Sequence, residues 1–247
     1  MKKNKITSLI ISVLCAAFIT GCMSDGEPAN ISLPILEIKM QKAMDPDGTF
    51  RKARSYVQKQ MLIVKEGFWE TEKGYIVEVK FKRPGKMLVI VKEDNIPVRS
   101  IIFNGDNAWV VDYKKKKRTA VKGEQLEKMR ILFALGRPGS KYEDIFKEVK
   151  LFHDTINGRP YYKIKCISKF EDQEPLIIYV GEHNFLTKRI DVPPHTESII
   201  DTYGLHDGVI IPELTSEIVN GIERRYKLIV YKLNVDIDDN EFYPPTF

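Results

Sequence analysis

The stretch Tyr75–Val91, which reads YIVEVKFKRPGKMLVIV, indicates the fold class more clearly than any other part of the chain. Apolar and charged residues largely alternate in its first part, so four apolar side chains share one face of a strand: Tyr75, Val77, Val79 and Phe81. Pro84-Gly85 marks a turn, and the run Met87–Val91 that follows is apolar at every position. This second strand needs cover on both faces, or a lipid-like ligand on one of them.

Turn signals continue along the chain at short intervals on either side of this hairpin. They are Lys73-Gly74, Pro84-Gly85, Asn104-Gly105, Asn157-Gly158, Gly181, Asp207-Gly208 and Asn220-Gly221. A further alternating segment places Tyr162, Ile164, Cys166 and Phe170 opposite lysines. Such spacing favours antiparallel hairpins. No repeat, low-complexity tract or linker interrupts residues 33–247, so we expect a single domain there.

Three segments carry helical patterns instead. Ser32 can cap a helix that runs to about Met44, with Pro34 in its first turn. From about Lys122 to Leu135, four apolar residues follow one helical stripe: Leu126, Met129, Leu132 and Phe133. A capping-box pattern that begins at Ser140 predicts another short helix, with apolar contacts from Tyr142, Ile145 and Phe146.

The N-terminus has the order of an export signal. Three lysines precede an uncharged run from Ile6 to Ile19, and Thr20-Gly21-Cys22 follows. The run is shorter than the roughly 20 residues that cross a bilayer as a helix. Residues 19–22 resemble the lipobox of bacterial lipoproteins, which implies a signal peptide over residues 1–21 and a lipid on Cys22. A secretory signal with an incidental cysteine is the alternative. Residues 22–32 are polar and turn-forming, which predicts a flexible tether.

Charge and cysteine content narrow the class of protein. The formal net charge is +5, and it falls to +2 when the three lysines of the signal are removed, so the mixed charges argue against a nucleic-acid partner. Cys15 leaves with the signal and Cys22 carries lipid, so Cys166 has no partner for an internal disulfide. We expect Cys166 to be a small buried hydrophobic residue, rather than a reactive thiol.

The chain contains no recognisable catalytic motif. His153, His183, His195 and His206 are its histidines, and no zinc-binding, nucleophile-elbow or paired-cysteine pattern accompanies them. We therefore expect no enzyme activity, no cofactor and no metal site. The acidic segment Asp236–Glu241 lacks the spacing of a calcium loop, so a solvated acidic end is expected. Lys114–Arg118 is expected to be a solvated hairpin tip, with contact to anionic lipid head groups as the alternative.

Several of these elements together resemble the outer-membrane lipoprotein-sorting family, the LolA/LolB-like proteins. The resemblance rests on their order: a helix comes first, then the Arg83–Met87 turn and the Asn104–Trp109 hairpin, then the central helices and returning strands. The later segments that fit are Tyr179–Ile190, Tyr203–Pro212 and Asn234–Phe242. The resemblance implies a mainly β fold with some α-helix: an open, strongly curved antiparallel sheet of about ten to eleven strands, an unclosed barrel, with helices over its concave face.

The family resemblance also implies an apolar cavity between the helices and the sheet, which would hold acyl chains. On this hypothesis the concave wall contains Met87, Val89, Phe103, Trp109 and Val111, and the movable cover contains Leu126, Met129, Leu132 and Phe133. The alternative is that all nine belong to an ordinary core. One sequence does not tell which face of a strand points inward.

The expected function follows from the anchor and the cavity. We expect a cell-envelope lipoprotein, attached to the membrane through lipidated Cys22, that binds acyl chains of a lipid or lipoprotein for transport or sorting towards the outer membrane. Met23 and Ser24 follow the cysteine, without the aspartate that retains enterobacterial lipoproteins in the inner membrane, so the outer membrane facing the periplasm is favoured. The alternative is a tethered envelope sensor of the same fold that binds a protein partner, as anti-sigma regulators with related folds do.

Overall fold

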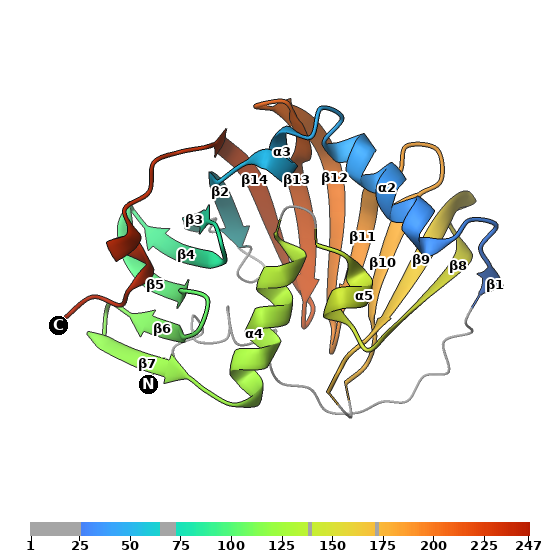
Figure 1. Ribbon diagram of the computed structural model, residues 1–247. Coiled ribbons are helices and arrows are strands. Elements are labelled where there is room, and N and C mark those ends of the chain that lie inside the picture. Colours follow the sequence, from blue (N-terminus) through green and yellow to red (C-terminus); the bar gives the residue numbers. More distant parts are fainter. Residues whose placement is uncertain (1–25, 65–72, 138–139, 171–172) are drawn as a thin grey trace.

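One antiparallel sheet organises the whole chain. The computed structural model describes residues 26–64, 73–137, 140–170 and 173–247. These residues form 14 strands in the order β1-β8-β9-β10-β11-β12-β13-β14-β2-β3-β4-β5-β6-β7. The sheet curves around the helices and stays open between its edge strands β1 and β7 (Figure 1). The open, curved antiparallel sheet expected from the sequence is therefore confirmed.

The strand count is higher than the ten to eleven strands expected. The first half of the sheet contains β2 (Ser55–Val64), β3 (Lys73–Lys82), β4 (Lys86–Glu93), β5 (Ile96–Phe103), β6 (Ala108–Asp112) and β7 (Lys117–Val121). The second half contains β8 (Glu148–Ile156), β9 (Arg159–Ile167), β10 (Leu176–Gly181), β11 (Thr187–Val192), β12 (Thr196–His206), β13 (Val209–Val219) and β14 (Ile222–Leu233). The short β1 (Glu27–Pro28) and the polar β7 have no apolar alternation. They are strands only because their backbones pair with a neighbouring strand.

Tight turns set the register of the hairpins. In three of them an Asn-Gly or Asp-Gly pair has positive φ at both residues: Asn157-Gly158, Asp207-Gly208 and Asn220-Gly221. These are the two-residue turns whose twist matches that of antiparallel strands. Asp94-Asn95 forms a fourth turn of this kind, with φ of 50° and 63°, although it has no glycine and was not expected from the sequence.

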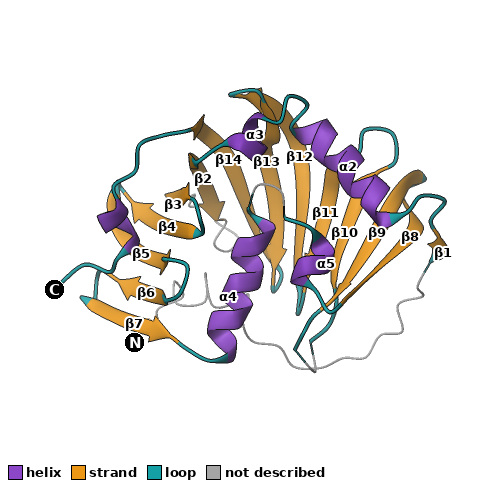
Figure 2. Ribbon diagram, in the orientation of Figure 1, coloured by secondary structure: helices purple, strands orange, loops and turns teal. Residues whose placement is uncertain are grey.

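The strand order explains why the helices lie where they do. The chain leaves the sheet at the edge strand β7 and re-enters it at β8, near the other edge, so the connection crosses one face of the sheet. That connection contains α4 (Glu124–Leu135) and α5 (Tyr142–Ile145). The helix α2 (Leu33–Met44) and the short α3 (Thr49–Lys52) lead from β1 to β2. Figure 2 shows α2, α4 and α5 in front of the curved sheet; we call the face they cover the inner face.

The predicted helices are confirmed, with different capping. Ser32 is the N-cap of α2, but its side chain makes no capping hydrogen bond. The capping box expected at Ser140 is wrong, because Lys141 is the N-cap of α5 and makes no side-chain cap either. Glu37 of α2 supplies the missing acceptor: the backbone N–H of Tyr142 donates to its carboxylate at 2.9 Å. The acceptor thus comes from another helix, which no local pattern reveals.

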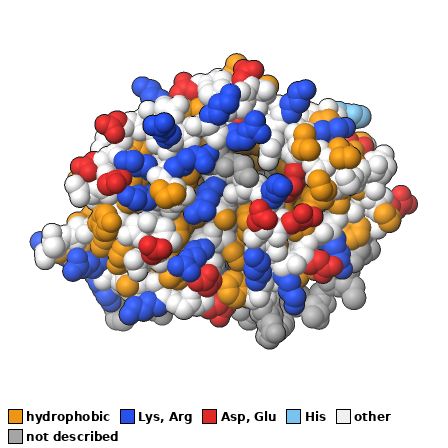
Figure 3. Space-filling model, viewed as in Figure 1, with side chains coloured by type: hydrophobic (Ala, Val, Ile, Leu, Met, Phe, Trp, Pro, Cys, Tyr) orange, Lys and Arg blue, Asp and Glu red, His pale blue; other side chains and the backbone are white. Residues whose placement is uncertain are grey.

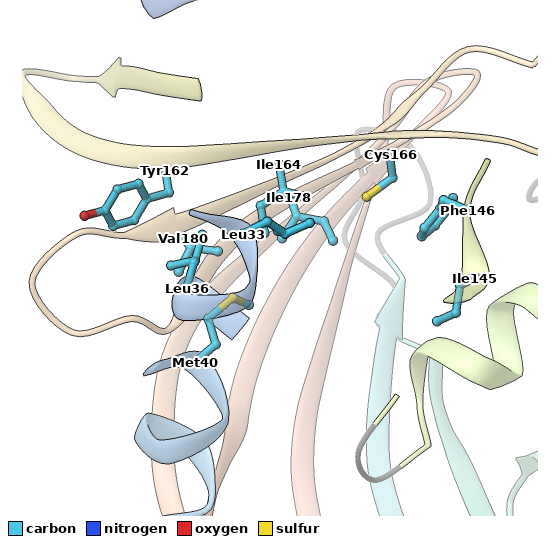
Figure 4. Packing of buried hydrophobic residues seen from close by; sticks show 10 residues of the cluster. All are labelled: Leu33, Leu36, Met40, Ile145, Phe146, Tyr162, Ile164, Cys166, Ile178 and Val180. Atoms are coloured by element: carbon cyan, nitrogen blue, oxygen red, sulfur yellow. The ribbon is translucent and has the colours of Figure 1, made fainter. Parts of the chain in front are cut away.

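A first core cluster joins α2 and α5 to the second half of the sheet. Leu36 of α2 is fully buried against the strands. The strand residues Ile164, Cys166 and Val180 are fully buried in the same cluster. Figure 4 shows the apolar side of α2 turned towards β10, while Ile145 and Phe146 approach Cys166. Cys166 is a free, buried thiol, and the expectation of a small hydrophobic residue in the core is confirmed.

The C-terminal segment covers the outer face of the sheet, opposite the helices. Phe242 of the 3-10 helix η2 (Asp239–Phe242) is fully buried and Ile237 is 2% exposed, and both pack against β4, β5 and β6. Asp239 pairs with Lys82 at 2.8 Å and with Lys86 at 3.0 Å. The acidic end is therefore not a freely solvated tail, because the carboxylates of Asp239 and Glu241 pair with lysines and its apolar residues cover the outer side of β4.

The N-terminal end of the domain is also ordered. Glu27 pairs with His153 and Pro28 pairs with Phe152 in the β1–β8 ladder. The backbone N–H of Asn30 donates to His153 Nε2 at 3.2 Å. The segment expected as a flexible tether is thus held to the sheet from Glu27 onward, because β8 offers an edge with unpaired backbone groups. Cys22 itself lies outside the described residues.

Candidate functional site

The candidate site is the region where α4 packs against the first half of the sheet. The inner side of β4 and β5 presents Met87, Val89, Ile101 and Phe103, since these residues pair across the two strands. Met87 and Phe103 are 7% and 2% exposed, whereas Val89 and Ile101 are only partly buried. The structure therefore places the predicted wall residues Met87, Val89 and Phe103 on the inner face.

Two of the predicted wall residues lie on the opposite face. Trp109 and Val111 pack with Ile102, Ile237 and Phe242 on the outer side of the sheet. Their assignment to the concave wall is wrong, because successive residues of a strand point to opposite faces. Phe103 pairs with Ala108, so Ala108 and Val110 take the inner positions of β6 instead. Four residues separate Phe103 from Ala108, and a turn of this length pairs the two residues. The length of the turn could therefore have revealed this register.

Helix α4 covers the inner face with one well-buried residue. Met129 is 4% exposed, while Leu126 and Phe133 are partly buried against the same cluster. The rings of Phe103 and Phe133 have centroids 5.0 Å apart. The side chain of Leu132 lies outside the described parts of the chain. Three of the four predicted cover residues therefore face the inner side of the sheet, as the helical stripe predicted.

Strands from distant parts of the sequence complete the inner face. Tyr56 of β2 lies between Phe81, at 5.2 Å between ring centroids, and Tyr231 of β14, at 5.9 Å. Burial raises the pKa of the Tyr56 hydroxyl to about 12. Val209 and Ile211 of β13 belong to the same cluster. None of these residues was predicted, because the β14–β2 pairing joins segments far apart in the sequence and leaves no local signal.

Two contacts join α4 and the residues that follow it to hairpin turns of the sheet, and one of them is a hydrogen bond. Arg130 Nη2 donates to the backbone carbonyl of Asp106, in the β5–β6 turn, at 3.1 Å. At the other end, the guanidinium of Arg137 lies against Gly85 in the β3–β4 turn, so closely that a Cβ on Gly85 would be 2.2 Å from Arg137 Nη2. A side chain at position 85 would displace the flexible end of Arg137 from this position. Both contacts join the cover to hairpin turns.

Burial perturbs two titratable groups near the helices, Glu37 and Cys166. Burial raises the pKa of the Glu37 carboxyl, although the hydrogen bond from the Tyr142 N–H acts in the opposite direction. Burial also raises the pKa of the Cys166 thiol to about 12, so this thiol stays protonated and weakly nucleophilic at neutral pH. Across the described ranges, no three His, Cys, Asp or Glu side chains gather closely enough to hold a metal ion.

His153 and His206 belong to the inner face, because they pair with Tyr162 and Val209 of its core clusters, whereas the lysine cluster lies at a hairpin tip. His153 contacts Glu182 beside the β1 edge, and His206 Nε2 lies 2.9 Å from Glu213 on the β12–β13 hairpin. Lys114 pairs with Glu93 at 2.8 Å, while Lys115 and Lys116 are exposed. The prediction that Lys114–Arg118 forms a solvated hairpin tip agrees with this arrangement.

Beneath α4, the inner face supplies mainly apolar contact area. Apolar side chains from α4 and from β2, β4, β5, β6, β13 and β14 face one another there. Figure 3 shows hydrophobic side chains between charged ones over much of the helix-bearing side. Within the described ranges, no helix is both long enough and apolar enough to cross a membrane.

Comparison with solved structures places this fold. A LolA superfamily protein from Nitrosomonas europaea matches with a TM-score of 0.59 and 13% identity, over 87% of this chain and 98% of that chain. A DUF1329 family protein from Desulfovibrio piger matches with a TM-score of 0.58 and 11% identity, over 85% and 95%. An outer membrane lipoprotein-sorting protein domain from Vibrio parahaemolyticus matches with a TM-score of 0.56 and 10% identity, over 84% and 94%.

These likenesses show the fold. No protein-family model and no curated protein matches the chain by sequence. The expected LolA/LolB-like architecture is confirmed, since the three structures share it over nearly their whole length.

Proposed function

We propose that the chain is a cell-envelope lipoprotein that holds acyl chains of a lipid or lipoprotein between α4 and the inner face. The observation that carries this proposal is the incomplete burial of apolar side chains that face each other. Val89, Ile101 and Val110 on the strands, and Leu126 and Phe133 on the helix, all remain partly exposed to solvent. A solid core buries such residues at close-packed density. Partial exposure on both sides favours a site that an apolar ligand completes.

The chemistry of the site suits acyl chains better than polar ligands. Each buried CH₂ group contributes about 0.8 kcal/mol without any directional contact. An acyl chain therefore needs apolar walls, and the residues named above provide them on both sides. The contacts of α4 with the turns at Asp106 and Gly85 are local, so the helix can move while the sheet stays intact.

The anchor is the second part of the proposal. Residues 1–21 would act as the signal peptide and Cys22 would carry the lipid, which places the domain outside the cytoplasm. Met23 and Ser24 favour the outer membrane, with the domain facing the periplasm. Transport or sorting of lipid or lipoprotein towards that membrane would follow from an anchored carrier whose cover opens.

Mass spectrometry of organic extracts from the purified chain tests the carrier directly. We expect co-purified lipid or lipoprotein acyl chains. In the variant Val110→Trp, the larger side chain occupies the space beneath α4 and displaces about three CH₂ groups, so binding of a fluorescent fatty acid should fall at least about ten-fold. The control is Ile96→Trp, because Ile96 is 67% exposed on the β4–β5 turn, away from α4.

Three outcomes separate the functions. Loss of binding in Val110→Trp, with the Ile96→Trp control and both melting temperatures unchanged, supports the carrier. A chain purified without any lipid, and with no affinity for the fatty acid, contradicts it. Recovery of a protein partner from the envelope in that case would favour the tethered sensor module instead.

A further inference from the structure

The attachment of Glu27 to the sheet limits the distance between the domain and a membrane that holds Cys22. Glu27 and Pro28 pair with β8, and Ala29 and Ile31 pack against the first core cluster. The chain is therefore attached to the sheet from Glu27 onward.

The number of residues between Cys22 and this point is small. Five residue steps separate Cys22 from Glu27, and they span at most about 17 Å when fully extended. If Cys22 carries the lipid, as the proposed function holds, the bilayer surface lies within this reach of β1. Figure 1 shows β1 next to the first turn of α2, so this end of the helix comes close to the membrane.

The solvent side of α2 has an unusual composition. Leu33, Leu36 and Met40 are buried under the helix, as an amphipathic pattern requires. On the other side, Ile35 is 50% exposed and Ile38 is 64% exposed. Their spacing places them on one surface with two exposed lysines. We call this surface, made of Ile35, Ile38, Lys39 and Lys42, the α2 outer surface.

The charge of the α2 outer surface has one sign. The only acid in α2 is Glu37, which is 8% exposed and accepts the Tyr142 N–H on the inner side. Glu182, on the neighbouring β10–β11 turn, contacts His153. Lys39 Nζ lies 4.6 Å from the ring centroid of Phe185 on the same turn. Figure 3 shows hydrophobic and basic side chains next to one another over α2, at the upper right of the view.

We propose that the α2 outer surface docks on the anionic lipid bilayer that holds Cys22, with Ile35 and Ile38 in the interface and Lys39 and Lys42 at the head groups. The short connection to Cys22 and the absence of acids on this surface both point to a membrane as the occupant. Docking would orient the domain with β1 and α2 at the membrane and with the edge strand β7 away from it (Figure 1). The orientation of the domain thus follows from the fold and does not depend on whether the inner face carries lipid.

The test uses the mature lipidated chain in vesicles of phosphatidylethanolamine and phosphatidylglycerol. An environment-sensitive dye is attached at Ile38→Cys, and in a matched variant at Ile96→Cys, because Ile38 and Ile96 are 64% and 67% exposed. Cys166 is fully buried and does not compete for the dye. We expect lipid-borne quenchers to quench the dye at position 38 and a water-soluble reductant to reach it slowly. The dye at position 96 should show the reverse.

Charge reversal provides the second measurement. Each lysine next to an anionic surface contributes about a five-fold factor in binding. Lys39→Glu with Lys42→Glu should therefore lower the docked-to-undocked ratio at least about 25-fold and make position 38 as accessible as position 96. Two equally accessible dyes in the native chain overturn the proposal. So does protection at position 38 that requires a second protein or rises with protein density, because the occupant is then a protein.

A separate measurement isolates the anchor. The Cys22→Ala chain should leave the membrane fraction, since a single weak surface contact does not hold a protein on a bilayer. If the same share of the Cys22→Ala chain stays in the membrane fraction, Cys22 is not the anchor of the proposed function. The limit on the distance between β1 and the bilayer then no longer holds. An anchored chain whose dye at position 38 is accessible contradicts only the docking.

Discussion

Phe103 of β5 and Phe133 of α4 have ring centroids 5.0 Å apart and ring planes inclined by 42°. This tilted pair is the aromatic contact that joins the cover to the sheet. Phe103 is 2% exposed and is fixed by its neighbours on β4 and β6, whereas Phe133 is partly buried. The ring on the sheet is therefore enclosed by its neighbours, whereas the ring on the helix keeps part of its surface exposed.

Removing the Phe133 ring should loosen the cover. We expect Phe133→Ala to lower the free energy of unfolding by about 1–3 kcal/mol, since an aromatic pair and part of a buried side chain are lost. Phe133→Leu keeps most of the apolar area and should cost less. Urea denaturation measures both. Equal stability of Phe133→Ala and the native chain would show that this pair does not hold α4.

Phe242 should matter far more than the other phenylalanine near the C-terminus. Phe242 is fully buried on the outer face, whereas Phe247 is 55% exposed. We expect Phe242→Ala to cost about 3–5 kcal/mol, because it opens a cavity over β4 and β5. Phe247→Ala should change stability by less than about 1 kcal/mol. Thermal unfolding compares the two; similar losses would mean that the C-terminal segment does not pack as described.

Glu78 should stabilise the outer face at neutral pH. It is 4% exposed and lies 2.6 Å from Lys92, with Lys59 and Lys80 within 4 Å. Burial alone would raise the pKa of this carboxyl, but the hydrogen bond from Lys92 and the lysine charges hold the pKa below its ordinary value. This stabilisation is present above the unfolded pKa and is lost as the pH falls through the folded pKa.

Glu78→Gln should therefore destabilise the chain by about 1–3 kcal/mol at pH 7. The difference from the native chain should shrink as the pH falls below about 4.5, the ordinary value for this group. Glu124→Gln is the control, because the Glu124 carboxylate is 60% exposed and its ion pair, with Lys128 on α4, lies at the surface. Stability measured against pH would contradict this account if both variants gave the same profile.

Glu37 should have the opposite pH dependence. Burial raises the pKa of its carboxyl, so the folded state favours the protonated form. The corresponding stability is fully present below the unfolded pKa of about 4.5 and is lost as the pH rises through the folded pKa. Glu37→Gln keeps the acceptor for the Tyr142 N–H without the charge. We expect this variant to be more stable than the native chain at pH 7 and equal to it below pH 4.5. Glu148→Gln, at an exposed carboxylate, should show no such trend.

The sequence by itself determined the local structure of much of the domain. Alternation in Tyr75–Phe81 gave an antiparallel strand, and Asn157-Gly158 and its counterparts gave tight turns with positive φ. The apolar stripe of α4 placed Met129 and Phe133 towards the sheet. These features depend on neighbours within a few residues, and so the local pattern contains the information needed to predict them.

Only the tertiary structure decided which strand faces line the candidate site. Trp109 and Val110 are adjacent and both apolar, yet the first packs beneath the C-terminal segment and the second faces α4. A period of two separates the two faces of a strand but does not say which face is inner. The pairings β14–β2 and β1–β8, and the cap that Glu37 provides for α5, also join segments far apart in the chain. Such contacts form only when the whole sheet has assembled, because no local pattern specifies a distant partner.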